Sequence, residues 1–188
     1  RAWKPFILVA SYVFYASADP RFTLLLAAIT LGTQLGATLV SRSNDPARRR
    51  WVTAATVAFD LAVLGVFKYY GFFVGQFDAR LDSIGLGAPL PLLQIALPVG
   101  LSFFTFQAIS YVVDVKRGLC DRAGTLDVAI YLSFFPHLVA GPIVRAREFL
   151  PQLAKPRDPK DVAVGAGVTL IAIGLVKKVV IADALARG

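Results

Sequence analysis

The sequence predicts an all-α fold: a polytopic transmembrane helical bundle that contains a re-entrant broken helix. The first observation behind this prediction is composition. The chain of 188 residues is 56% hydrophobic with a mean hydropathy of +0.64, whereas soluble domains are about 45–50% apolar. The second is the alternation of apolar stretches with short charged loops. The third is an apolar stretch that carries the only histidine, His137, beside helix-breaking prolines.

The apolar stretches are compared with the roughly 20 residues that a helix needs to cross about 30 Å of hydrocarbon. Pro5–Ala18 is short for a span, whereas Phe22–Val40 fits one and Trp51–Val74 fits with some tilt. A kink is expected at Pro98 and Gly100 in the fourth stretch. The six stretches are Pro5–Ala18, Phe22–Val40, Trp51–Val74, Leu90–Val113, Leu126–Phe149 and Val162–Ala186.

Basic residues are unevenly distributed among the loops. Arg42–Arg50 holds four arginines against one aspartate, and both Asp114–Asp127 and Arg145–Asp161 are also basic. Gln76–Pro89 holds one basic residue and two aspartates. Short loops rich in Lys and Arg remain on the cytoplasmic side of a membrane. We therefore predict that the three basic loops lie inside and that Gln76–Pro89 lies outside.

The two consecutive basic loops around Leu126–Val144 cannot flank a single membrane crossing. We therefore predict that this segment enters the membrane and returns to the same side, with breaks near Pro136 and at Gly141-Pro142. A broken backbone at membrane depth must be buried in protein or line a wet cavity, because lipid cannot satisfy its hydrogen bonds. The segment is therefore expected to have a polar environment inside the bundle.

His137 is the first candidate functional residue, since ionisable groups at membrane depth are expensive and commonly functional. As an acid–base group it could line a substrate path or assist proton movement. The structural alternative is a histidine whose ring is satisfied by backbone carbonyls at a helix break. The sequence leaves both interpretations open.

Gln107, Arg117 and Arg145 are the other substrate-path candidates. Gln107 lies on a predicted helix, where polar side chains commonly bind neighbouring helices. Arg117 is expected at the cytoplasmic mouth of that helix, where interfacial charge balance is the favoured explanation and substrate or partner contact is the alternative. Arg145 lies in a basic loop, and its guanidinium group matches phosphate or carboxylate. Anchoring on the cytoplasmic side explains Arg145 without a ligand.

Three further polar features have structural explanations that we favour. Asp60 lies in the middle of a predicted span and is expected to pair with a lysine or with helix-end amides. Lys177 and Lys178 are expected at the interfacial end of a helix, with an anion-attracting cavity as the alternative. Cys120 is the single cysteine, so an internal disulfide is excluded and a free loop thiol is expected.

Several functional classes are excluded by the same sequence. One histidine and one cysteine provide no metal-ligand spacing, and there is no Gly-rich phosphate loop or G-x-S-x-G nucleophile motif. We expect no metal site and no cofactor. The net charge of +8 lies in loops between apolar runs, which favours membrane topology over nucleic-acid binding.

Four blocks of the sequence resemble the membrane-bound O-acyltransferases, and in particular the bacterial branch that acetylates alginate. They are LPVGLSFFTFQAISYVVDVKRG (Leu97–Gly118), FFPHLVAGPIVRAREFLPQL (Phe134–Leu153), FDLAVLGVFKYYGFF (Phe59–Phe73) and GLVKKVVIADALA (Gly174–Ala186). The resemblance implies a ring of helices around a funnel, through which an acyl group passes from the cytoplasmic side to an extracytoplasmic acceptor. His137 matches an earlier, less uniform histidine position, and the essential histidine of the family is expected in a later block.

The resemblance also implies that residues 1–188 form one partial transmembrane domain, the N-terminal half without the catalytic half, and that this piece alone is inactive. The expected activity is transfer of an acetyl or short acyl group to hydroxyls of an alginate-like or cell-envelope polysaccharide. Expected partners are a thioester or carrier-bound acyl donor, a polysaccharide or periplasmic transfer protein, and lipid of the bacterial inner membrane. The alternatives are a transporter or channel, or a scaffold of an envelope-assembly complex.

Overall fold

The computed structural model describes residues 3–83, 98, 100–138, 141, 143–155 and 163–186, with backbone alone for 18 and 71–83. Every regular element within these ranges is helical, which confirms the predicted all-α class. The chain divides into two compact units, Arg1–Ala154 and Lys155–Gly188, which are described separately. That they form one transmembrane domain stays a prediction.

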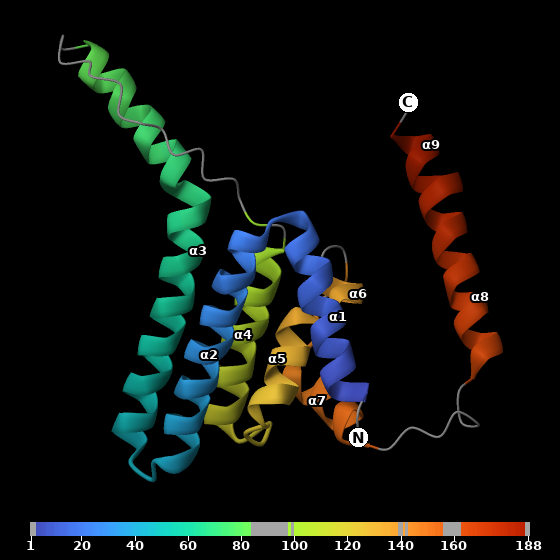
Figure 1. Ribbon diagram of the computed structural model, residues 1–188, viewed down its shortest axis with the longest axis horizontal. Coiled ribbons are helices and arrows are strands. Elements are labelled where there is room, and N and C mark those ends of the chain that lie inside the picture. The colour runs from blue at the N-terminus through green and yellow to red at the C-terminus, as the bar shows by residue number, and fades with distance from the viewer. Residues whose placement is uncertain are drawn as a thin grey trace. The chain divides into compact units, whose positions relative to one another are not determined.

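The first unit begins with four helices, shown in blue to yellow-green in Figure 1. Asp19 lies between the first two helices. Its carboxylate accepts the backbone N–H of Arg21 at 2.9 Å and so caps the second helix. Asp45 similarly accepts the N–H groups of Ala47 and Arg48. The helices are α1 (Trp3–Ala18), α2 (Pro20–Arg42), α3 (Pro46–Ser83) and α4 (Leu101–Arg117).

The core of this unit lies where α2, α3 and α4 pack on one another. Tyr111 of α4 is fully buried there, and its hydroxyl accepts the backbone N–H of Ala123 at 3.0 Å. Gln34 of α2 donates its amide to the Ala123 carbonyl at 3.0 Å. These bonds hold the loop after α4 against α2, and so fix where the following segment starts.

Three short helices follow, and they correspond to the predicted broken segment. They are α5 (Thr125–Ser133), α6 (Phe135–Leu138) and α7 (Ala146–Ala154). α1 packs against α5 and α6, and α7 packs against α4 and α5. The break between α5 and α6 occurs at Phe134, whose ψ of 103° is not helical. Residues 139, 140 and 142, which include Pro142 of the expected Gly141-Pro142 break, lie outside the described residues.

The second unit is one helical rod over Val164–Leu185, formed by α8 (Val164–Leu175), the π-helical turn η2 (Val176–Ala182) and α9 (Asp183–Leu185). Lys178 in the π-helical turn forms an ion pair with Asp183. By length and composition, this rod and two helical stretches of the first unit, Pro20–Arg42 and Pro46–Tyr70, could each cross a membrane.

Two predicted boundaries are wrong. α3 continues to Ser83 instead of ending at Val74, so the beginning of the expected outer loop is helical. Gly100 does not kink a continuous helix, because it adopts φ 76° immediately before α4 begins. A left-handed residue cannot continue a right-handed helix, so the chain starts a new helix there. Leu90–Leu97, the first part of that predicted span, lies outside the described residues.

Candidate functional site

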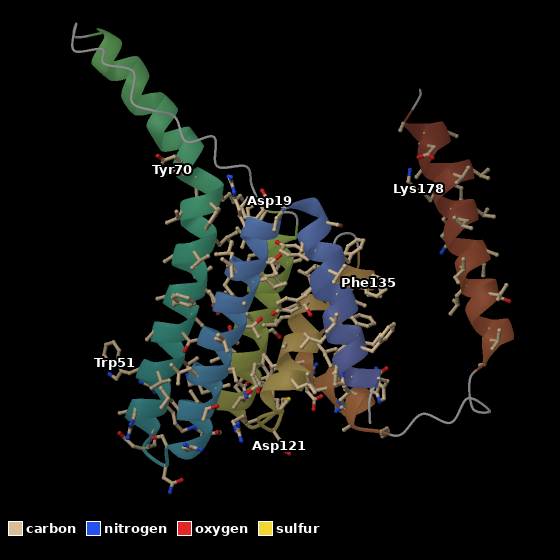
Figure 2. All side chains as sticks on the ribbon, viewed as in Figure 1. Asp19, Trp51, Tyr70, Asp121, Phe135 and Lys178 are labelled. Carbon is tan, nitrogen blue, oxygen red and sulfur yellow. The ribbon has the colours of Figure 1, made fainter. Side chains whose placement is uncertain are left out.

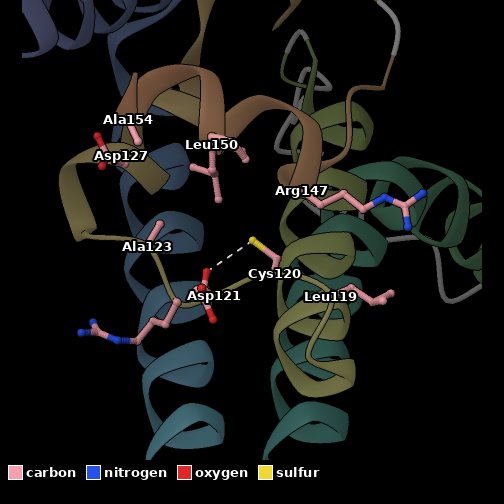
Figure 3. Close-up of a pocket in the computed structure, with 10 residues that line it drawn as sticks. Leu119, Cys120, Asp121, Ala123, Asp127, Arg147, Leu150 and Ala154 are labelled. Carbon is pink, nitrogen blue, oxygen red and sulfur yellow. Dashed lines mark hydrogen bonds between the residues drawn. The ribbon is translucent and has the colours of Figure 1, made fainter. Parts of the chain in front are cut away.

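The broken segment enters and leaves the first unit at the same end. At its start, Lys4 of α1 pairs with Asp127 of α5 at 2.6 Å. After the break, the hydroxyl of Tyr131 donates to the carbonyl of Val144 at 2.7 Å, which ties the returning chain to α5. Figure 3 shows Asp127 and the α7 residue Leu150 around one pocket. The chain therefore returns to the end at which it entered, as the re-entrant prediction requires.

His137 lies on α6 near the far end of this path, and the structure brings it against Gln107 of α4. The two Nε2 atoms are 3.2 Å apart in a buried position. The amide nitrogen of Gln107 can only donate, so in this arrangement His137 Nε2 accepts and its proton resides on Nδ1. The backbone of Tyr131 is the other hydrogen-bonding neighbour of the ring.

Gln107 retains one free polar atom. Only 2% of the residue's surface is exposed, and its Oε1 atom has no hydrogen-bond partner among the residues that the structure describes. Leaving a buried acceptor unsatisfied costs about 1–3 kcal/mol. A ligand hydroxyl or a water molecule could therefore be stabilised at this oxygen.

Two aromatic rings pack against His137. The centroids of Phe134 and Phe149 lie 5.1 and 5.6 Å from the imidazole, and the two phenyl rings are 5.2 Å apart. Phe149 reaches the site from α7, so the returning helix packs against the imidazole. These contacts make the surroundings apolar and strengthen each polar interaction inside them.

Two glycines allow the chain to approach closely at this site. A Cβ atom added to Gly100 would lie 2.5 Å from the Leu138 carbonyl oxygen, and one added to Gly141 would overlap His137. Gly100 also has φ 76°, a conformation that side chains with a Cβ rarely adopt. The start of α4 and the turn after α6 therefore both require glycine to hold His137 in place.

Arg117 and Arg145 are not part of this polar pair. Both are exposed, and no described hydrogen bond or ion pair joins either of them to His137 or Gln107. Arg117 is the last residue of α4. Arg145 directly precedes α7, and its carbonyl accepts the N–H of Glu148 at 3.0 Å. The structure thus brings together two of the four predicted site residues and leaves two in exposed positions near helix ends.

A pocket of about 410 Å³ lies between α7 and the loop after α4. Its lining includes Cys120 and Asp121 of the loop and Arg147 of α7, and Figure 3 shows the Arg147 side chain extending away from the other two. The Cys120 thiol is free, as predicted. Burial, followed by the negative charges of Asp114 and Asp121, raises the pKa of the Cys120 thiol. The sequence alone did not indicate this pocket, because no local pattern predicts that α7 packs against that loop.

Asp60 is buried without the partner that was expected. Its side chain is fully buried, and neither carboxylate oxygen has a hydrogen-bond partner within the described residues. Its pairing with a lysine or with helix-end amides is therefore not seen in the described part of the first unit and stays a prediction. Asp60 is mid-helix on α3, and its polar neighbour is Thr33 of α2. The position faces α2 because the buried stripe of α3 also contains Thr53 and Thr56.

Comparison with known proteins gives a consistent set of relatives. The chain is 40% identical over 188 residues to a probable alginate O-acetylase AlgI of Pseudomonas aeruginosa, covering 96% of this chain and 35% of that protein. It is 40% identical over 186 residues to the protein of the same name from Azotobacter vinelandii, covering 96% and 36%. It is 30% identical over 210 residues to a peptidoglycan O-acetyltransferase of Helicobacter pylori, covering 96% and 38%.

These relatives confirm the resemblance that the four sequence blocks indicated. The chain spans about a third of the length of the curated relatives it matches. No protein-family model matches it. No solved structure matches it either.

Proposed function

Because this chain resembles O-acetylases of sugar polymers along nearly its whole length, we propose that the complete protein is a membrane O-acyltransferase. It transfers an acetyl or similar short acyl group to hydroxyls of an exported or cell-envelope polysaccharide. The relatives are named for alginate and for peptidoglycan, which supports a polysaccharide acceptor. The proposed location is the bacterial inner membrane, with the basic end of the first unit in the cytoplasm.

The observation that carries the proposal is the buried pair of His137 and Gln107 on a segment that turns back inside the bundle. Buried polar groups are costly unless they are hydrogen-bonded, and ionisable groups at membrane depth are commonly functional. The free Oε1 atom of Gln107 offers an acceptor for a substrate hydroxyl. This pair therefore forms part of the wall of the proposed acyl path.

The proposed reaction is attack of a sugar hydroxyl on a thioester. The hydroxyl oxygen bonds to the carbonyl carbon and the carbon–sulfur bond breaks. The hydroxyl proton passes to a base and then to the departing thiolate. The Nε2 atom of His137 already accepts from Gln107, so His137 is better suited to positioning than to proton abstraction. This assignment agrees with a catalytic base supplied by a later block, as the resemblance implies.

Arg117 and Arg145 are proposed to meet the acyl donor rather than the acceptor. Both are exposed cations, and a thioester donor or an acylated carrier presents phosphate or carboxylate groups that a guanidinium can bind. The acyl group would then be passed to the polysaccharide, or to a periplasmic transfer partner. Neither role uses a metal or an organic cofactor in this chain.

The test is complementation with the complete gene in a strain that lacks its own polysaccharide O-acetylation. We expect the wild-type gene to restore acetyl content in one envelope or exported polymer. His137→Ala should lower that content at least tenfold, which corresponds to about 1.4 kcal/mol in barrier height. Gln152→Ala is the matched control, because Gln152 is an exposed amide on α7 outside the site. Restored transport without acetylation, or full acetylation by His137→Ala, would contradict the proposal.

A further inference from the structure

We propose that the groove between α2 and α3 is a binding site for an anionic phospholipid of the surrounding membrane. One acyl chain occupies the groove and the phosphate lies against arginines at its basic end. The groove has a volume of about 400 Å³ and is separate from the site of His137. Its walls include Gly32, Gly36 and Leu39 of α2 and Val52, Ala55 and Phe59 of α3.

The groove is apolar because its one hydroxyl is already satisfied. The side chain of Thr56 donates to the carbonyl of Val52 at 2.9 Å within α3. Gly32 and Gly36 let the two helices approach, since an added Cβ on Gly32 would lie 2.7 Å from Phe59 and one on Gly36 would collide with Thr56. The walls of the groove are therefore complementary to a hydrocarbon chain.

Helical periodicity places cations where the groove ends. Arg42 follows the wall residue Leu39 by three positions on α2, and Arg48 precedes Val52 by four positions on α3. Residues three or four apart lie on one face of a helix. Arg49 is adjacent, and its guanidinium donates to the Lys116 carbonyl at 2.8 Å. The apolar walls therefore lead into a basic rim, as a lipid chain leads into its headgroup.

The cations of this rim have no acidic side chain to neutralise them among the described ion pairs. Asp45 is close in sequence, but its carboxylate oxygens accept the backbone N–H groups of Ala47 and Arg48. Unpaired guanidinium groups at a cytoplasmic helix end bind anionic lipid headgroups. An anionic lipid therefore fits this rim better than a zwitterionic one.

Depth in the membrane supports the same occupant. Trp51 is 76% exposed, and Figure 2 shows it projecting sideways from α3. Exposed tryptophan is typical of the membrane–water interface, so the arginine rim lies at headgroup level. Val52 to Phe59 rises about 10 Å along α3, which is a third of the hydrocarbon thickness. The groove therefore accommodates the part of a lipid acyl chain that is nearest the headgroup.

The experiment uses the complete protein in nanodiscs of phosphatidylcholine that contain a small fraction of phosphatidylglycerol with a photoreactive acyl chain. After irradiation, mass spectrometry maps crosslinks to α2 and α3. We expect crosslinks at the groove walls, and at least fivefold fewer with photoreactive phosphatidylcholine at the same fraction. Arg42→Gln with Arg48→Gln should remove this preference for the anionic probe.

A second pair of variants tests the groove itself. Ala55→Phe fills the groove with a ring and should reduce crosslinking at least threefold. Ala54→Phe is the matched control, because Ala54 is also an exposed alanine on α3 but does not line the groove. Equal crosslinking by the two probes, equal effects of the two alanine variants, or no lipid crosslink in the groove would each overturn the proposal. The last result is expected if another protein segment covers the groove.

Discussion

At the residue scale, the hydrogen bonds of His137 suit it to positioning a substrate rather than to taking up a proton. Its Nε2 atom accepts from Gln107, and the backbone of Tyr131 interacts with the ring. Both ring nitrogens are therefore engaged without any charged partner. A buried polar pair of this kind is costly to leave half-satisfied, but replacing both members by apolar groups of similar shape can be almost neutral. Stability and activity should therefore respond differently to such a replacement.

We predict that the free energy of unfolding of the double variant Gln107→Leu with His137→Phe lies within about 1 kcal/mol of the wild-type value, because the variant removes both polar partners together. The single variant Gln107→Leu should be less stable than the double, since it leaves Nε2 of His137 without a donor. Thermal unfolding in detergent measures both. Polysaccharide acetylation should fall at least tenfold in both variants. A double variant with full activity would indicate that the pair is only structural.

Cys120 gives a second prediction, which depends on pH. Burial and the carboxylates of Asp114 and Asp121 raise its pKa, and only the thiolate reacts with alkylating reagents. With other cysteines of the complete protein replaced, iodoacetamide should react with Cys120 more slowly at pH 8 than with an unfolded peptide thiol. Its rate should continue to rise above the pH where the peptide reaches its plateau. Asp121→Asn should increase the rate at pH 8, and an unchanged rate would exclude the electrostatic contribution.

At the element scale, the sequence was most informative where apolar length and breaking residues act locally. Pro5–Ala18 and Phe22–Val40 were correctly predicted as helices, and Pro136 correctly predicted a break nearby, which occurs at Phe134. The end of α3 was missed, since no proline or glycine pair stops the helix before Ser83. The contact between Gln107 and His137 depends on how α4 packs against α6. Helix periodicity carries no information about that packing.

The contact of Gly100 with Leu138 can be tested by comparing alanine substitutions at Gly100 and Gly118. Gly100 and Gly118 both adopt positive φ, 76° and 71°, but only Gly100 contacts Leu138, and an added Cβ at Gly118 would meet nothing within 4 Å. We predict that Gly118→Ala costs about 1–2 kcal/mol from backbone strain alone. Gly100→Ala should cost at least 1 kcal/mol more, because the Leu138 carbonyl must move. Unfolding in detergent compares the two, and equal losses would show that the contact at Leu138 is unimportant.

At the scale of the whole first unit, the basic segments gather at one end. Lys4 pairs with Asp127 at the entrance of the broken segment, and Arg49 bonds to the end of α4 at Lys116. Asp19, between α1 and α2, lies at the opposite end in Figure 2. This charge arrangement was predictable, because loop composition alone determines it. The burial of Asp60 beside Thr33 was not predictable, since it depends on which face of α3 meets α2.

The re-entrant path leads to a topology prediction for the complete protein in cells. With Cys120 changed to serine, single cysteines at Leu126 and Arg147 should both react with a membrane-impermeant maleimide only after the inner membrane is opened. A cysteine at Arg21, which is exposed beyond the Asp19 cap, should react from the periplasm in intact cells. The reason is geometric: Asp127 and Arg147 line one pocket, so the chain between them has to turn back. Labelling of Leu126 and Arg147 from opposite sides would require a full crossing by α5 and α6. Such a crossing would move α7 away from Cys120 and separate Phe149 from His137.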